Sequence, residues 1–265
     1  MRRNGPIALA FNALVIAFML APLLVVCVVA FTPENTLTMP TTHFSLRWFR
    51  AAFDHPDFMQ SFYNSLWLAL SSATLATLLA VPAGMAITRY EFPGRGFLNG
   101  LFLSPLIIPH LVLGVALLRL FALIGGTGSF AWLVMAHALI VTPYTLRLVV
   151  AALVGFDRSA EQAALSLGAT QAKVMRLVVL PQVMPCVLSG TLIVFGLSAS
   201  SFAIPGLLGG RRLKMVATVV YDQYLSELNW PMGATIAVAL LLINLLVMLS
   251  WNRLVEGRYK KSLGE

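Results

Sequence analysis

Six long, continuous apolar stretches constrain this chain more than any other feature of its sequence. They cover residues 7–31, 62–88, 97–124, 130–154, 183–208 and 231–251. A helix needs about 20 apolar residues to cross roughly 30 Å of hydrocarbon, and each stretch is long enough. Strands of a membrane barrel would instead alternate apolar and polar residues over about 10 positions. We therefore predict an all-α, polytopic membrane protein with six transmembrane helices.

The charged residues indicate how such a chain is oriented. They make up only 11% of the sequence, whereas soluble domains carry about 25%. With the N-terminus in the cytoplasm, twelve of the eighteen Lys and Arg residues fall in cytoplasmic segments and five in outer loops. Because Lys and Arg are enriched on the cytoplasmic side, we predict that both termini are cytoplasmic. The net charge of +8 forms no single stripe, so we predict no nucleic-acid partner.

The apolar pattern also suggests a division of the chain. We expect residues 1–61 to hold the first transmembrane helix, retained because its apolar run is too long for an ordinary signal peptide, and an outer loop. Residues 62–254 would form a core of five transmembrane helices with a cytoplasmic loop at 157–181, and residues 255–265 a cytoplasmic tail.

The sequence shows no recognisable pattern for catalysis or metal binding. No His or Cys stands at metal-ligand spacing from His43, His55, His110 or His137. The glycine-rich residues 125–129 lack the Lys-Ser/Thr ending of a phosphate-binding loop, and no such sequence occurs elsewhere in the chain. We therefore predict no catalytic residue, no metal and no cofactor, and we expect any ATP hydrolysis to occur in a separate partner subunit.

Two self-sufficient alternatives stay open at this point. A secondary transporter usually relays ions through buried carboxylates, yet we place none of the ten Asp and Glu residues in the hydrocarbon. An intramembrane serine protease would need a Ser and a His facing each other at depth. The available serines are Ser104, Ser198, Ser200 and Ser201, beside His110 and His137. Serines in membrane helices more often serve helix packing.

Two prolines interrupt the third apolar stretch. Pro105 and Pro109 stand four residues apart, which predicts a kinked helix. His110 directly follows the second proline. The kink is either purely structural or part of a solute pathway that His110 lines.

The polar segment between the fourth and fifth stretches, residues 157–181, is the most informative one. Asp157 or Ser159 is suited to cap a short helix, and Glu161 would lie in its first turn, where the helix dipole favours an acid. Gly168 is suited to the left-handed conformation that ends a helix.

A second short helix is predicted to begin at Thr170 and to last until Pro181 opens the next membrane helix. Ala163, Ala164 and Leu167 recur at helical spacing, which predicts a small face against which a soluble partner could pack. An ordinary amphipathic connector would carry the same features, so the residues alone leave both interpretations open.

The spacing of this segment resembles the EAA signature of permease subunits of ATP-binding-cassette importers. The pattern is matched, in order, by Ala163, Ala164, Gly168, Val178, Leu180 and Pro181. One position departs from it, because Gln162 occupies the place of the family's Glu and Glu161 stands one residue earlier. Residues 202–210 and 229–234 resemble the spermidine/putrescine branch of these permeases, whose relatives also handle iron, phosphonates or opines.

This resemblance implies a type I importer permease fold and a multi-pass location in the bacterial inner (cytoplasmic) membrane. It implies cytoplasmic ATPase subunits, a second permease subunit and an extracytoplasmic substrate-binding protein as partners, and import of a small solute, with a polyamine as the expected substrate. The implied coupling residues are Glu161, Gln162, Ala163, Ala164, Gly168, Leu180 and Pro181. The candidate pathway residues are His110, Ser200, Ser201 and Phe202.

Overall fold

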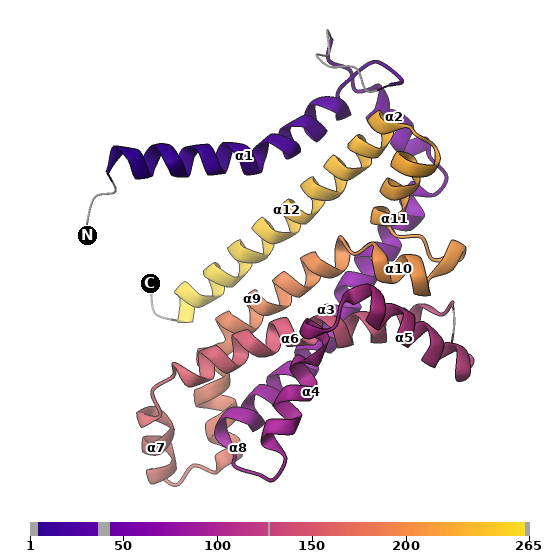
Figure 1. The fold of residues 1–265 in the computed structure, drawn as a ribbon. Helices are drawn as coiled ribbons and strands as arrows, with labels where there is room; N and C mark the ends of the chain where they lie inside the picture. Colours follow the sequence, from indigo (N-terminus) through magenta and orange to yellow (C-terminus); the bar gives the residue numbers. More distant parts are fainter. Residues whose placement is uncertain (1–4, 37–42, 127, 263–265) are drawn as a thin grey trace. The chain divides into compact units, whose positions relative to one another are not determined.

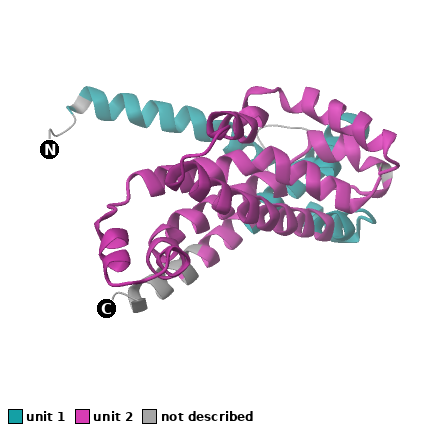
Figure 2. Cartoon of the chain, turned by 90° about the horizontal axis from the view of Figure 1, so that it is seen from below, with its two compact units in different colours: residues 1–62, 216–243 teal, residues 63–215, 244–265 magenta. Residues whose placement is uncertain are grey.

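The computed structural model describes residues 5–36, 43–126 and 128–262, and these residues form helices and connecting turns with no strand among them (Figure 1). The chain divides into two compact units (Figure 2). One comprises residues 1–62 and 216–243, and the other comprises residues 63–215 and 244–265. The division by sequence into residues 1–61, 62–254 and 255–265 stays a prediction.

The first unit is built from the two ends of the chain. Its elements are α1 (Pro6–Ala30), α2 (Arg47–Asp54), the start of α3 (Phe58–Arg89), α11 (Val216–Tyr221), the π-helical turn η3 (Asp222–Ser226) and the first part of α12 (Trp230–Ser262). Trp48 of α2 packs in one apolar cluster with Val219 and Ile236. In a second cluster Ala30 packs near α12, where the Thr235 hydroxyl donates to the Ala30 carbonyl at 3.1 Å.

The second unit contains most of the membrane-spanning helices. Its elements are the rest of α3, α4 (Arg95–Ile107), α5 (His110–Leu123), α6 (Phe130–Val154), α7 (Ser159–Ser166), α8 (Gln171–Val174), the π-helical turn η1 (Met175–Val179), α9 (Leu180–Ala199), α10 (Ala203–Leu208), the 3₁₀ turn η2 (Gly210–Arg212) and the last part of α12. Helix α6 packs along α9. Leu133, Ile140 and Val194 of these two helices share the main apolar cluster.

Glycines let the helices of the second unit approach closely. A Cβ added at Gly84 of α3 would lie 2.7 Å from Cγ1 of Val149 in α6. A Cβ added at Gly190 of α9 would lie 3.3 Å from the Cα atom of Thr145 in α6. Small residues at such positions are typical of helices that associate inside a membrane, where close packing supplies much of the stability.

The prediction of membrane-spanning helices is confirmed, with one change. Within the described residues, five helices are long and apolar enough to cross a membrane: Ile7–Ala30, Phe58–Arg89, Phe130–Val154, Gln171–Ala199 and Trp230–Trp251. A sixth span exists only if the pair α4 and α5 counts as one, and these two helices meet at an angle of 109°.

The third span is therefore broken, whereas the sequence predicted a kinked but continuous helix over residues 97–124. Pro105 lies inside α4 without ending it. The break comes at Ile108 and Pro109, which have ψ angles of 130°. The residue before a proline is pushed toward the extended region, and Ile108 follows that rule.

The fifth span begins and ends earlier than the predicted residues 183–208. A continuous helical run covers Gln171–Ala199, so the predicted second short helix does not end at Pro181. Its wide turn η1 comes just before this proline, and the Leu180 N–H bonds to the Met175 carbonyl. Pro181 has no N–H to donate and stands near the start of α9, where the run tolerates it. Residues 200–202 then separate α9 from α10.

Candidate functional site

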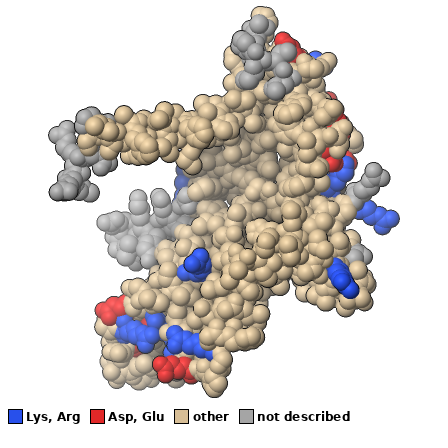
Figure 3. All heavy atoms as spheres, viewed as in Figure 1, with Lys and Arg blue, Asp and Glu red and all other residues tan. Residues whose placement is uncertain are grey.

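The polar segment after α6 folds as a short helix, a tight turn and the beginning of the next span. Four residues separate the end of α6 from the start of α7. Gly168 ends it with φ of 83°, a left-handed conformation that glycine adopts without strain, as predicted. Figure 3 shows one group of charged side chains in the region of α7 and α8 and others elsewhere on the same face, with mostly uncharged surface between them.

The start of α7 is held by a local turn instead of the predicted cap. Arg158 occupies the N-cap position, and its side chain makes no capping bond. The Asp157 carboxylate accepts the Ser159 N–H at 3.0 Å and the Ser159 hydroxyl at 2.6 Å. These two hydrogen bonds stabilise the charged carboxylate and hold the pKa of Asp157 below its ordinary value.

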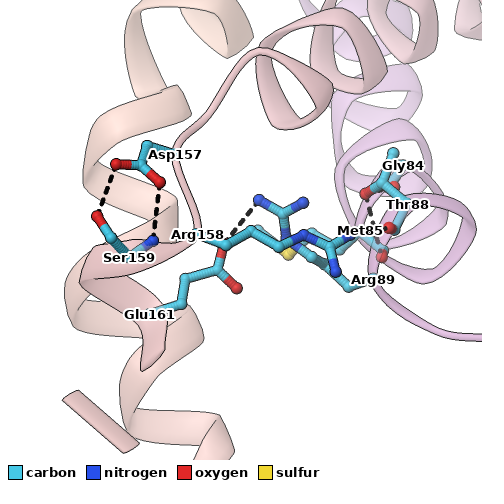
Figure 4. Close-up of polar contacts among 8 residues, drawn as sticks. All are labelled: Gly84, Met85, Thr88, Arg89, Asp157, Arg158, Ser159 and Glu161. Carbon is cyan, nitrogen blue, oxygen red and sulfur yellow. Dashed lines mark hydrogen bonds and ion pairs between the residues drawn. The ribbon is translucent and has the colours of Figure 1, made fainter. Parts of the chain in front are cut away.

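Glu161 turns inward from α7 toward the end of α3. Its Oε1 atom lies 2.7 Å from Nη2 of Arg89, and the two side chains are 14% and 5% exposed. Arg158 donates from Nη2 to the Thr88 carbonyl at 3.2 Å. Figure 4 shows how these side chains bridge from α7 to the last residues of α3.

The opposite side of α7 and the turn after it face outward. Gln162, Ala163, Leu165 and Ser166 are exposed. Leu167, a large apolar side chain, is 88% exposed. We name this set, together with the exposed Gly168, the outer face of α7.

The predicted small face of Ala163, Ala164 and Leu167 is therefore divided between two sides. Ala164 is partly buried against the apolar cluster around Val174 and Val179, whereas Ala163 and Leu167 point outward. The reason is that α7 is only eight residues long and lies against α8 and η1 along a narrow strip.

The last two residues of the signature lie where the segment joins α9. Leu180 is partly buried in the same apolar cluster as Ala164, whereas Pro181 is exposed. Both belong to the continuous run Gln171–Ala199. The structure brings Leu180 and the inner side of α7 to one cluster and leaves Gln162 and Gly168 on the surface.

The candidate pathway residues lie at the two breaks in the spans. His110 is exposed at the first position of α5, and Ser200, Ser201 and Phe202 separate α9 from α10. The Ser200 hydroxyl donates to the Gly196 carbonyl at 2.8 Å. The helices that follow the two breaks pack on each other, because a Cβ added at Gly114 of α5 would meet side chains of α10 at 2.9 Å.

Arg89 and Arg158 were not singled out from the sequence. Both counted there only as two of the twelve cytoplasmic cations. The signal that could have found Arg89 is its place at the end of an apolar run, since a cation at a helix C-terminus is favoured by the dipole and seeks an acid nearby. Among the described residues, no group of three or more His, Cys, Asp or Glu side chains could hold a metal ion.

Comparisons with known proteins agree with this geometry. Residues 76–261 match the family described as binding-protein-dependent transport system inner membrane component. The chain is 26% identical over 255 residues to the spermidine/putrescine transport system permease protein PotC of Escherichia coli (strain K12), covering 96% of both chains. It is 27% identical over 253 residues to the putrescine transport system permease protein PotI of the same organism, covering 92% of this chain and 89% of the relative.

A relative with another substrate is about equally similar. The sulfate transport system permease protein CysT of Salmonella typhimurium is 28% identical over 257 residues, covering 91% of this chain and 92% of the relative. Overall identity therefore does not separate the substrates of these relatives.

Solved structures share the fold. A bacterial ABC transporter for import of the acidic polysaccharide alginate aligns with a TM-score of 0.74 at 15% identity, covering 92% of this chain and 93% of that chain. The MetNI methionine ABC transporter aligns with a TM-score of 0.65 at 20% identity, covering 75% of this chain and 94% of that chain. The family match and the permease relatives support the predicted importer permease over a secondary transporter or an intramembrane protease. The chain belongs to the family of binding-protein-dependent transport system inner membrane components and is the membrane-spanning permease subunit of an ATP-binding-cassette importer.

Proposed function

We propose that the outer face of α7 is the surface on which a cytoplasmic ATPase subunit docks. The observation that carries this proposal is the open turn at the end of α7. Gly168 has a left-handed backbone with no other atom within 4 Å of the position of a Cβ, and the neighbouring Leu167 is 88% exposed. A small residue next to an exposed apolar side chain gives a partner both a close approach and an apolar anchor.

The proposed docking surface would place Glu161, Gln162, Ala163, Ala164, Gly168, Leu180 and Pro181 in two different roles. Gln162, Ala163 and Gly168 would contact the ATPase, because they are exposed. Ala164 and Leu180 would shape the surface from behind, because they pack in the apolar cluster beneath it. Gln162 would offer the ATPase an amide in place of the family's carboxylate, so the contact would rest on hydrogen bonding instead of an ion pair.

The docking proposal is tested by co-purifying the chain with an ATPase subunit from detergent, comparing the native chain with Gly168→Asp. Aspartate tolerates a left-handed backbone, so the variant should fold while placing a charged side chain in the dock. Gly128→Asp is the matched control, since Gly128 is also left-handed, with φ of 74° and open space around it, in the distant turn after α5. We expect only Gly168→Asp to lose the ATPase.

Failure of the native chain to retain a co-expressed ATPase would contradict the docking proposal. An equal loss with Gly128→Asp would contradict it too, because general misfolding would then explain the result.

We also propose that the substrate is a polyamine, as it is for PotC and PotI by their names. The segment 221–230 supports a cationic substrate, because it contains two carboxylates and no Lys or Arg. Its aromatic rings include Tyr224 and Trp230, which stack edge to face with their centroids 5.4 Å apart. Carboxylates and aromatic rings both attract organic ammonium groups, whereas sulfate would be repelled by the carboxylates.

Uptake by cells that lack their own polyamine and sulfate importers would test this proposal. Cells expressing the complete importer should take up labelled putrescine, and excess spermidine should compete while sulfate should not. Uptake of labelled sulfate without putrescine uptake would contradict the proposal and favour the chemistry of CysT.

The remaining parts of the proposal concern assembly and location. The importer would combine this chain with a second permease subunit and an extracytoplasmic substrate-binding protein in the bacterial inner membrane, with both termini and residues 157–181 in the cytoplasm. In the chain expressed without the ATPase, a cysteine at the exposed Ser166 should resist a membrane-impermeant thiol reagent in whole cells and react in inverted vesicles. Labelling in whole cells would contradict this orientation.

A further inference from the structure

We propose that Arg89 and Glu161 form a transmission link, which carries movement of α7 into α3 and so couples ATPase closure to opening of the pathway. The inference rests on the proposed docking at α7 and goes beyond it. It assigns docking to one side of α7 and transmission to the other.

The first observation is that two helix ends of opposite polarity meet at this pair. Arg89 lies in the last turn of α3, and Glu161 lies in the first turn of α7. A cation is favoured at a helix C-terminus and an anion at a helix N-terminus. Each charge is thus stabilised by its own helix and by the other charge 2.7 Å away.

The second observation is burial. The Arg89 side chain is 5% exposed and the Glu161 side chain 14%, so little water can replace the partner if the two separate. Arg89 Nε, Arg89 Nη2 and Glu161 Oε1 make no aligned hydrogen bond with any described residue. Separating the pair would therefore leave a buried charge at Arg89 and a partly buried charge at Glu161 without compensation, which makes the two helix ends move together.

The third observation is that other contacts also reach the last two residues of α3, Thr88 and Arg89. Arg158 binds the Thr88 carbonyl from the residue just before α7, and the Phe156 ring lies 5.9 Å from Cζ of Arg89. Within α7 itself, Ala164 is the residue that joins an apolar cluster. Polar contacts thus join the start of α7 directly to the end of α3.

The fourth observation shows where movement of α3 would go. Gly84 lies five residues before Arg89, at a point where α3 and α6 are in close contact. A shift of the α3 end would therefore press on Val149 and displace α6, which runs through the centre of the unit. The carboxylate stands one residue earlier here than in the family signature. This position turns Glu161 toward α3, whereas Gln162, at the family's Glu position, faces outward.

The test uses the complete importer, with its ATPase, second permease and binding protein, reconstituted in proteoliposomes. Glu161→Gln and Arg89→Gln each remove one charge. Arg89→Glu combined with Glu161→Arg reverses the pair. Glu91→Gln is the matched control, because Glu91 is an exposed carboxylate two residues beyond Arg89 that forms no ion pair with the described residues.

Two quantities separate transmission from docking: the amount of ATPase retained on purification, and the substrate transported per ATP hydrolysed. We expect both single variants to retain the ATPase like the native chain and to lose about tenfold in transport per ATP, a typical size for coupling between two sites. The reversed pair should recover part of that loss, since the charges again attract while each opposes its helix dipole. Glu91→Gln should change neither quantity.

Three results would overturn the transmission link. Unchanged transport per ATP in Glu161→Gln would show that the pair carries no coupling. Loss of ATPase retention as complete as in Gly168→Asp would assign Glu161 to docking instead. No recovery of transport per ATP in the reversed pair would mean that shape and not charge matters at these positions. This result decides the question even if the single variants assemble poorly. A native complex without ATPase would instead refute the proposed function.

Discussion

Helices α6 and α7 are separated by only four residues, yet different forces hold them. In α6, 61% of the most apolar part of the helix is buried inside the protein. Apolar side chains and glycines of neighbouring helices pack against it. Helix α7 has no buried residue and depends on an ion pair, a hydrogen bond and one alanine.

This difference teaches how rigidity is distributed along the chain. Packing inside a membrane protein involves many weak contacts that fail together, so α6 can move only together with the helices packed on it. A few polar contacts can shift as a group without unfolding the rest, which suits a helix that must follow a moving partner. Four predictions test the contrast, beginning with the largest expected effect.

Gly190→Leu in α9 should destabilise the protein by about 3 kcal/mol, because the new side chain would collide with the backbone of Thr145 in α6. Thermal unfolding in detergent measures this. Gly196→Leu is the matched control, because a Cβ at Gly196 meets no atom within 4 Å and both variants gain the same helix propensity. Equal melting temperatures for the two variants would show that the α6–α9 contact is looser than the structure indicates.

Leu133→Ala in α6 should cost about 2 kcal/mol, near the low end for a core leucine. Leu133 is fully buried, but the unfolded reference in detergent also keeps the side chain in an apolar medium, so mainly the lost packing counts. Leu139→Ala on the same helix is the control, because Leu139 is exposed and lipid or detergent can fill its place. A larger effect of Leu139→Ala would reverse the assignment of the inner and outer sides of α6.

Arg89→Met should loosen α7 by about 1 kcal/mol and leave the spans intact, because it strands the partly buried Glu161 carboxylate at the edge of the unit. Arg89→Met combined with Glu161→Leu should restore much of that protection, since no charge is then left alone. Hydrogen exchange of α7 compared with α6 gives the measurement. Faster exchange throughout α6 would mean that the two helices do not differ as described.

The smallest effect concerns Asp157 and pH. Its folded-state pKa lies below the ordinary value, so the carboxylate contributes stability above the unfolded pKa of about 4, and this contribution is lost as pH falls through the folded pKa. We expect the protection of the amide hydrogens at the start of α7, measured relative to their intrinsic exchange rates, to fall only at acidic pH. Ser159→Ala should move that onset to higher pH, because it removes one of the two hydrogen bonds. An unchanged onset would show that the Ser159 hydroxyl does not hold the carboxylate.

Much of the fold followed from periodicity and length alone. Four spans lie close to the predicted apolar stretches and a fifth overlaps its stretch, because a long apolar run has no stable place except in a membrane or a core. The left-handed Gly168 was also predictable, because few residues tolerate that backbone. Proline marked the break in the third span, but its size was not predictable, since Pro105 and Pro109 look alike in sequence and only the second ends a helix.

The candidate site was predictable as a segment and not as a set of contacts. Spacing identified Ala163, Ala164 and Gly168 but put Ala163 and Ala164 on one face, whereas only Ala164 packs inward. Arg89 is 72 residues away from Glu161 in the chain, and no local pattern links them. Such a pairing depends on where two helices end in space.

The sequence by itself determined that this chain spans a membrane as helices and that a polar segment with the importer signature lies between two spans, because hydropathy, proline and glycine act locally. The tertiary structure decided how much of each apolar helix is buried. The most apolar parts of α1 and α6 are both suited to a membrane, but 11% of the first and 61% of the second is buried inside the protein. It also decided that Glu161 faces Arg89 while Gln162 faces outward. Burial and charge pairing depend on neighbours that are distant in the chain, so they follow only from how the helices pack.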